Sequence, residues 1–435
     1  MEKTSAQPGD KVKITAKTST EEGIMMPSFD EEIILIKLNT GYNLGFNKKE
    51  VKKIDILDKA AAKAAENKES PKNKDLPTIA ILHTGGTIAS KVDYRTGGVV
   101  SAFSPQDLLQ MFPELAKIAN LESELVAQMW SDDLRFKHFS LISQKIEAMI
   151  VKKKVKGIII GMGTDNLAVA AAALSFIVEK TPVPIILVGS QRSSDRGSAD
   201  AGMNLISAAE FIVNTNFAGV AICMHESEED TSCLILPANK TYKLHSSRRD
   251  AFKAVNTGAI ARIDYLQRKI TFFQKDHPAP DKSLILKPKM EEKVGLLKIH
   301  VNMFPEQFEF FKGYRGLVIE GTGLGHTPGQ VPNEICNIHK KIYPAIKKVI
   351  DSGCIVVMTT QCLFGRVQMH VYSKGTDLVN LGVISGEDML AETAFVKLAW
   401  LIGNYKDKEE IKKLVGTDLR GEINTRIGPD EFLEE

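Results

Sequence analysis

Two short segments of this chain place a threonine beside glycine just after an apolar run, where a hydroxyl group could act as a nucleophile. The first is HTGGTIAS, which begins at His83 and holds Thr84 and Thr87. A glycine-rich turn after a strand is typical of phosphate binding, but phosphate loops need GxxxxGK[ST] or GxGxxG, and this segment has neither spacing. A tight turn whose hydroxyls cap backbone groups is the structural alternative.

The second segment is MGTDN, Met162 to Asn166, in which Thr164 precedes Asp165. Thr or Asp would also suit the N-cap of a following helix, so this pair alone does not establish a site. If both segments end neighbouring strands, their hydroxyls and the carboxylate meet in one crevice. Because free threonine is a poor nucleophile, such a site needs an activating base.

The candidates for that base are one histidine and two lysines. His83 ends an apolar run, where a histidine is more often part of the core, and no convincing Ser-His-Asp set accompanies it. A lysine held near Asp and Thr could act instead, and the segment ANKTYKLHSSRRDAF supplies Lys240 and Lys243. Most lysines are solvated at the surface, which is the competing interpretation for both. The residue types alone leave the base undecided.

The elements that must position these groups form a regular pattern from Pro77 onward, where short apolar runs alternate with longer helical segments. Continuous apolar strands between helices predict an α/β fold with a parallel sheet covered on both faces. Such sheets bind ligands at the carboxyl ends of their strands. We therefore expect HTGGTIAS, MGTDN and GSQRSS to lie close together on one edge of the sheet.

The chain is expected to have four parts. Residues 1–57 predict a small N-terminal β-barrel-like domain, because KVKITAKT, EEIILIKLNTGYNLGF and VKKIDIL read as short strands with tight turns. Residues 58–76, rich in Ala, Lys, Glu and Pro, predict a linker. Residues 77–290 form the first α/β domain, with a β-hairpin near its end, and residues 291–435 form a second.

Composition narrows the class of protein. With 43% hydrophobic and 25% charged residues, the chain is typical of a globular protein. The 56 basic and 54 acidic residues leave a net charge of +2. This is too small an excess of basic residues to indicate nucleic-acid binding by itself. Five cysteines without a CxxC pair predict neither a zinc site nor a disulfide framework, and they suit a reducing cytoplasm. Neither a signal region nor a membrane span is predicted.

The motifs TGGTIA, GTD, ILVGSQR and KLHSSRRDAFKAVN together resemble those of the bacterial-type L-asparaginase family. The resemblance covers the chain from about Pro77 to its C-terminus. It implies an asparaginase-like core of two α/β domains that hydrolyses a side-chain amide and releases ammonia. It implies no metal or organic cofactor for this reaction.

The same resemblance assigns roles to residues of this chain. Thr87 matches the attacking threonine of the family, and Thr164 and Asp165 match its second motif. Lys243 matches the catalytic lysine, whereas Lys240 fits the family spacing less well.

Substrate-binding residues follow in the same way. Ser131 falls where the family holds the amino-acid end of the substrate, and Asp132 follows it. Backbone N–H groups around Gly86 to Thr87, or around Gly163 to Thr164, could stabilise the oxyanion of the reaction. Which threonine forms the acyl intermediate stays open.

Three features depart from a simple asparaginase. The chain runs from Met1 to His83 before the TGGTIA motif, Met162 stands where the family usually has His, and the loop from Gly321 to Gly329 contains His326. With the small N-terminal domain, these features resemble the amidase subunits of archaeal Glu-tRNA(Gln) amidotransferases.

That resemblance implies a set of partners. Ammonia would pass to a partner E subunit, which activates the glutamate of Glu-tRNA(Gln) with ATP and Mg²⁺. The implied assembly is a heterotetramer. Two copies of this chain form a homodimer core, and two E subunits bind to it. A free-standing L-asparaginase with an added domain is the alternative, and a non-catalytic scaffold is a third interpretation, which the intact set of Thr and Lys residues argues against.

Overall fold

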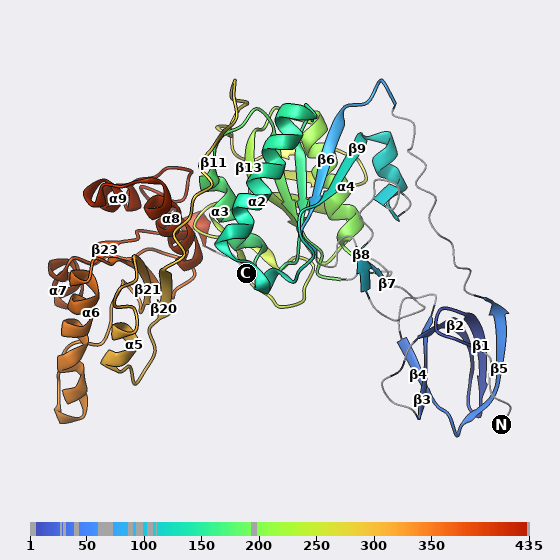
Figure 1. The fold of residues 1–435 in the computed structure, drawn as a ribbon, viewed down its shortest axis with the longest axis horizontal. Helices are drawn as coiled ribbons and strands as arrows, with labels where there is room; N and C mark the ends of the chain where they lie inside the picture. Colours follow the sequence, from blue (N-terminus) through green and yellow to red (C-terminus); the bar gives the residue numbers. More distant parts are fainter. Residues whose placement is uncertain are drawn as a thin grey trace.

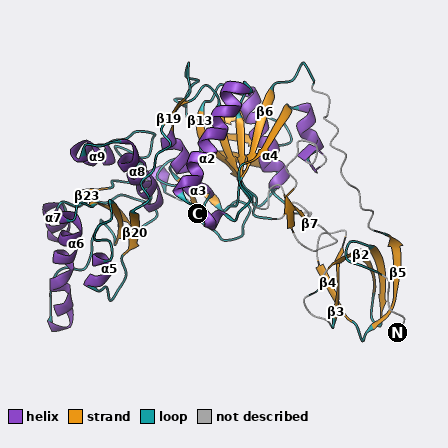
Figure 2. Cartoon of the chain, viewed as in Figure 1, coloured by secondary structure: helices purple, strands orange, loops and turns teal. Residues whose placement is uncertain are grey.

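The computed structural model describes residues 6–26, 28, 32–38, 43–59, 73–85, 90–92, 99–101, 108–109, 111–192 and 198–432. Its three largest sheets follow one another along the chain, as the change from blue through green to red shows (Figure 1). The N-terminal region is built from strands, whereas the central and C-terminal sheets lie among helices (Figure 2).

The N-terminal sheet is antiparallel, with the strand order β4-β3-β2-β1-β5. Val12, Ile14 and Ala16 alternate with partly exposed residues in β1 and join Ile36 and Phe46 in a core of their own. This agrees with the predicted small β domain, although β2 was not foreseen. The strands are β1 (Lys11–Ala16), β2 (Thr20–Met26), β3 (Ile33–Leu38), β4 (Asn43–Asn47) and β5 (Val51–Asp58).

The central sheet has the strand order β18-β17-β14-β13-β12-β10-β6-β9. The five strands from β13 to β9 are parallel, as predicted, but β14, β17 and β18 extend the sheet as an antiparallel edge. The strands are β6 (Thr78–His83), β9 (Asn120–Leu125), β10 (Ile158–Gly161), β12 (Pro184–Val188), β13 (Gly219–His225), β14 (Ser232–Pro237), β17 (Ala261–Asp264) and β18 (Ile270–Phe272).

Helices cover both faces of this sheet because its strands are apolar on both sides. Ala80 and Leu82 of β6 pack with helices α2 and α3, whereas Ile79 and Ile81 pack with α4 on the opposite face. This is the pattern of a buried parallel strand, whose successive side chains point to opposite faces. The helices are α2 (Phe136–Glu147), α3 (Leu167–Ile177) and α4 (Ala201–Asn214).

The C-terminal sheet is parallel in the order β20-β21-β22-β23. Helices α5, α6 and α7 share a core with one face, and α8 packs on the other. A 3₁₀-helix (Glu334–Lys341) precedes α6 and continues directly into it. The elements are β20 (Val294–Lys298), α5 (Pro305–Glu309), β21 (Gly316–Gly321), α6 (Ile342–Asp351), β22 (Ile355–Thr360), α7 (Ser373–Leu381), β23 (Ile384–Ser385), α8 (Ala391–Asn404) and α9 (Lys408–Val415).

Helix α8 joins the central and C-terminal domains. Phe176 of α3 stacks on Trp400 of α8 with ring centroids 5.8 Å apart, and the indole N–H of Trp400 donates to the carbonyl of Lys287 at 3.0 Å. The two domains therefore share one hydrophobic core. Across the described ranges of the chain, no helix has both the length and the apolar character needed to cross a membrane.

Candidate active site

The loops that carry the candidate residues leave the same edge of the central sheet. The N–H of Thr84, just after β6, donates to the carbonyl of Gly161 at 3.0 Å, and the N–H of Met162, just after β10, donates to Val188 at 3.1 Å. Because β6, β10 and β12 are parallel, their carboxyl ends meet there. The expected proximity of these strand ends is confirmed for the residues that the structure describes.

Thr164, Asp165 and Lys243 form one hydrogen-bonded group at this edge. The Lys243 amine donates to Thr164 Oγ1 at 2.9 Å and to Asp165 Oδ1 at 2.8 Å. Thr164 is buried, whereas the side chain of Asp165 is 73% exposed and that of Lys243 is 15% exposed. A lysine that contacts a hydroxyl on one side and a carboxylate on the other can accept and return protons, as acid–base catalysis requires.

A short hairpin brings Lys243 to this position. Strand β15 (Thr241–Lys243) pairs with β16 (Phe252–Ala254), with Lys243 opposite Phe252. In the connecting loop, Arg248 binds both carboxylate oxygens of Asp250, at 2.8 and 2.9 Å. This pair lowers the pKa of Asp250 to about 2. The hairpin thus places the Lys243 side chain, at the end of β15, against Asp165 just before α3.

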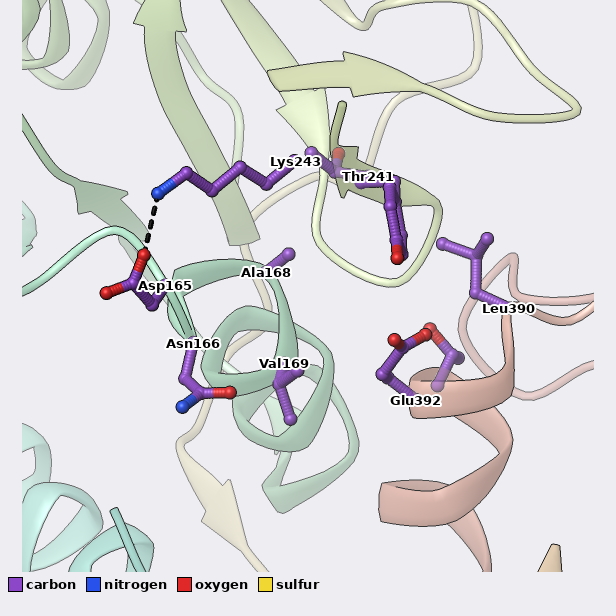
Figure 3. A pocket seen from close by; sticks show the side chains of 10 residues that line it. Asp165, Asn166, Ala168, Val169, Thr241, Lys243, Leu390 and Glu392 are labelled. Carbon is purple, nitrogen blue, oxygen red and sulfur yellow. Dashed lines mark hydrogen bonds and ion pairs between the residues drawn. The ribbon is translucent and has the colours of Figure 1, made fainter. Parts of the chain in front are cut away.

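A cavity of about 210 Å³ adjoins the Lys243–Asp165 pair, between α3, β15 and the start of α8. Figure 3 shows Lys243 reaching to Asp165 on one side, while Glu392 enters from α8 on the other. Burial raises the pKa of Glu392, and burial together with Glu392 raises the pKa of Tyr242. The lining residues are Asp165, Asn166, Ala168, Val169, Thr241, Tyr242, Lys243, Leu390, Glu392 and Thr393.

Ser131 lies beside the Thr164 loop, and Asp132 follows it at the surface. Ser131 is buried, its hydroxyl accepts from the Asn166 N–H at 3.3 Å, and its carbonyl accepts from the Asn166 side chain at 2.9 Å. A methyl group on Gly163 would lie 2.9 Å from Ser131 Oγ, so only glycine allows this approach without a shift. Asp132 is exposed.

Two predicted residues lie outside the described part of the chain. These are Gly86 and Thr87, so their positions relative to Thr164 are not described. The loop that holds them starts at Gly85, whose φ of 101° and close approach to the Met129 carbonyl both require glycine. The catalytic and binding roles of all eight predicted residues stay predictions.

The competing bases lie elsewhere. His83 is buried, and burial lowers its pKa to about 3, so it is neutral and a weak proton acceptor at neutral pH. This confirms that His83 belongs to the core. Lys240 is also buried and pairs with Asp388 at 2.5 Å. Of the two candidate lysines, only Lys243 contacts Thr164 and Asp165.

Sequence reasoning placed Gln191 at this edge, within GSQRSS, without assigning it a role, and it missed Asp200. The Thr164 hydroxyl donates to Gln191 Oε1 at 3.1 Å, and Asp200 accepts from the backbone N–H of Gln191 at 3.0 Å. Gly189 makes room for this contact, since a methyl group there would lie 2.7 Å from Thr164 Cγ2. The sequence pattern that could have indicated these residues is the polar run after VPIILVG. That run does not show which of its side chains contacts Thr164.

Comparison with known families agrees with this architecture. Residues 78–277 match the asparaginase N-terminal domain, residues 293–415 match the glutaminase/asparaginase C-terminal domain, and residues 6–57 match the GatD N-terminal domain. The fold is similar to that of the thermostable L-asparaginase from Thermococcus kodakarensis, with a TM-score of 0.70 and 26% identity over 80% of this chain and 100% of that one. L-asparaginase I from Vibrio cholerae gives a TM-score of 0.68 at 26% identity, over 80% of this chain and 99% of that one.

The fold and these matches define an asparaginase-type α/β protein with an added N-terminal domain. The chain is 41% identical to the D subunit of glutamyl-tRNA(Gln) amidotransferase from Pyrococcus furiosus, over 98% of this chain and 97% of that one. It is also 41% identical to the protein of the same name from Methanococcus maripaludis strain C7, over 96% of this chain and 98% of that one. The chain belongs to the family of glutamyl-tRNA(Gln) amidotransferase D subunits.

Proposed function

We propose that this chain is the ammonia-generating amidase subunit of a Glu-tRNA(Gln) amidotransferase. It hydrolyses the side-chain amide of glutamine or asparagine, and the ammonia passes to a partner, the E subunit (GatE). The partner uses ATP and Mg²⁺ to convert Glu-tRNA(Gln) into Gln-tRNA(Gln). The observation that carries the proposal is the contact of Lys243 with both Thr164 and Asp165, in a chain whose relatives are amidotransferase subunits.

In the proposed reaction Thr87 Oγ attacks the carbon of the carboxamide. The Asp165 carboxylate holds the Lys243 amine against Thr164 Oγ1, so a proton taken from a hydroxyl has a short path to the amine. The same path returns the proton to the departing nitrogen, which leaves as ammonia, and water then cleaves the acyl–threonine bond to free the acid and restore the hydroxyl. Burial of Thr164 keeps water away from the middle of this relay.

The rest of the site binds the substrate. Ser131 and Asp132 hold the amino-acid end, and the backbone N–H groups of Gly86 and Gly163 face the oxyanion that develops on the amide oxygen. The contact between Ser131 and Asn166, next to Asp165, supports placing the binding and reacting groups side by side. Fixed N–H donors aimed at a developing charge are worth a few kcal/mol of barrier in hydrolases, ~3 kcal/mol for one donor.

We extend the proposal to the assembly and its compartment. Two copies of this chain form a homodimer core and bind two copies of the E subunit, and the complex acts in the cytoplasm. The relatives' name as amidotransferase subunits supports a partner chain. All five cysteines are free, which suits a reducing compartment.

Replacement of the nucleophile separates the two half-reactions. Thr87→Ala is expected to abolish amidation of Glu-tRNA(Gln) with glutamine as donor, because no ammonia is made. Amidation with ammonium chloride should remain, because the chemistry of the partner is intact. The measurement is Gln-tRNA(Gln) formation by the purified complex with each donor.

Two results would contradict the proposal. If ammonium does not support amidation of Glu-tRNA(Gln) by the Thr87→Ala complex, the assignment of ammonia release to this chain and of amidation to its partner is wrong. If the wild-type chain hydrolyses amides equally fast with and without the partner and tRNA, it acts as a free-standing L-asparaginase with an added domain.

A further inference from the structure

The hydroxyl of Thr164 has two hydrogen-bond partners with opposite roles. Lys243 Nζ donates to Thr164 Oγ1 at 2.9 Å, and Thr164 Oγ1 in turn donates to Gln191 Oε1 at 3.1 Å. The hydroxyl proton therefore points to Gln191 and a lone pair points to Lys243. This is the arrangement expected while Lys243 is an ammonium ion, which has donors and no acceptor.

Gln191 is held in place by a buried carboxylate. Asp200 is fully buried and accepts hydrogen bonds from the backbone N–H groups of Gln191 and Arg192, both at 3.0 Å. It also accepts from the Ser190 hydroxyl at 2.8 Å and from the Asn204 amide at 3.2 Å. Charged acceptors make the stronger hydrogen bonds of proteins, so these bonds hold the backbone of Gln191 and Arg192 in place.

The side-chain amide of Gln191 has one orientation that suits an ammonium at Lys243. Its oxygen faces Thr164, and its Nε2 is buried without a hydrogen-bond partner among the described residues. Turning the amide would place a second donor against Thr164 Oγ1 beside Lys243 and leave the hydroxyl proton without this acceptor. A buried donor that lacks a partner calls for an explanation, and holding the Thr164 proton supplies one.

We propose that Gln191 is a positioning residue that holds the hydroxyl proton of Thr164 away from Lys243 until the Lys243 ammonium has given a proton to solvent. The Thr164 hydroxyl then turns and gives its proton to the neutral Lys243 Nζ, which becomes ammonium again, while Thr164 takes the proton of the attacking Thr87 hydroxyl. Gln191 thus stabilises the resting state and not the reactive one. This inference rests on the proposed function, since it concerns the same relay.

Charged groups approach Lys243 from three neighbouring elements. Asp165 contacts it directly from the start of α3, and Glu392 faces the cavity from α8. On β16, Lys253 donates to the carbonyl of Glu226 and lies near Asp250. Tyr242 is next to Lys243 on its own strand. None of these groups is altered by a substitution at Gln191, so a changed pH dependence would report on the Gln191 contact.

The test compares two variants of Gln191 through the pH profile of ammonia release from asparagine and glutamine by the full chain. Gln191→Met keeps the length of the side chain but removes the acceptor, which weakens the resting state, so activity should appear at lower pH. One net hydrogen bond of about 1 kcal/mol corresponds to a shift of roughly 0.7 pH unit. Gln191→Glu places a carboxylate near Thr164 and Lys243, which favours the ammonium, so activity should appear at higher pH.

A matched variant tests how Gln191 is held. Asp200→Asn is expected to loosen the support of Gln191, so it should lower the melting temperature and kcat and move the profile in the same direction as Gln191→Met, by a smaller amount. Gln191→Asn, which keeps the amide but is too short for the contact, should behave like Gln191→Met. It replaces Gln191→Met if that variant does not fold.

Opposite shifts for the two variants support the inference. Unchanged profiles, or shifts in one direction for both, overturn it. Complete loss of hydrolysis in a folded Gln191→Met overturns it as well, because Gln191 would then be needed for the chemistry itself. If Lys243→Ala retains wild-type hydrolysis, the proposed function fails, and this outcome is seen independently of any Gln191 variant.

Discussion

Two lysines three positions apart, Lys240 and Lys243, have opposite surroundings. Lys240 and its partner Asp388 have side chains that are 2% and 0% exposed, with the two charges 2.5 Å apart. Lys243 borders a cavity, and its partner Asp165 is largely exposed. The same pair of residue types is a buried structural contact in one place and, in the proposed function, a reactive group in the other. What separates them is access to water and to a hydroxyl.

The Lys240–Asp388 pair ties the domains together. Asp388 also accepts from the backbone N–H of Asn424 at 2.9 Å, and its carbonyl accepts from the side chain of Asn256 at 3.2 Å. Residues from the central domain and the C-terminal segment thus meet at Asp388, just before α8, with Lys240 and Asn424 at its carboxylate. A buried charge with this many partners is costly to disturb.

The largest expected effect is on catalysis, at Lys243. Lys243→Met should lower the rate of amide hydrolysis by about 10²–10⁴-fold, the usual contribution of an acid–base group. The melting temperature should change little, because Asp165 is exposed and does not need its partner. Ammonia release and thermal unfolding of the same preparation check this. A folded variant with unchanged turnover would remove the contrast between the two lysines.

The second effect is on stability, at Lys240. Lys240→Met leaves Asp388 buried and uncompensated, so the free energy of unfolding should fall by about 3–5 kcal/mol. The double variant Lys240→Met with Asp388→Leu should recover most of this loss, since it buries no charge. Urea unfolding of the three proteins measures the coupling. If the single and double variants lose equal stability, the pair is not the reason for the loss.

The smallest effect concerns the Arg248–Asp250 pair, which is more open to solvent than the Lys240 pair. Because the folded pKa of Asp250 is about 2, below its ordinary value of 3.8, the pair adds stability above pH 3.8 that is lost as the pH falls toward 2. Asp250→Asn should therefore be less stable than wild type at neutral pH, with the difference shrinking in acid. Unfolding midpoints across this pH range measure it, and a constant difference would contradict the assignment.

The choice between Lys240 and Lys243 shows how far sequence reasoning reached. Residue types and spacing left both open, because burial depends on contacts with Asp388, which is distant in the sequence. Only family resemblance favoured Lys243. The strand ends after β6, β10 and β12 were predictable, since continuous apolar runs between helices specify a parallel sheet. The antiparallel edge that begins at β14 was not predictable, because the hydrophobic periodicity of a strand does not reveal which strand it pairs with or in which direction.

Gln191 and Asp200 illustrate the other limit. Both occur in a polar run after β12, where any of several side chains could contact Thr164. Their roles depend on the path of the loop, which is set by hydrogen bonds from backbone N–H groups to Asp200. These hydrogen bonds cannot be predicted from the local sequence.

The stacking of Phe176 on Trp400 bears on how the cavity beside Lys243 can open. In many two-domain enzymes a hinge lets the halves swing apart and admit the substrate. Here α3 and α8 belong to one continuous core, so a swing would expose apolar surface on both sides and break the contact of Trp400 with Lys287. A swing of the two domains about α8 is therefore opposed by the core that they share.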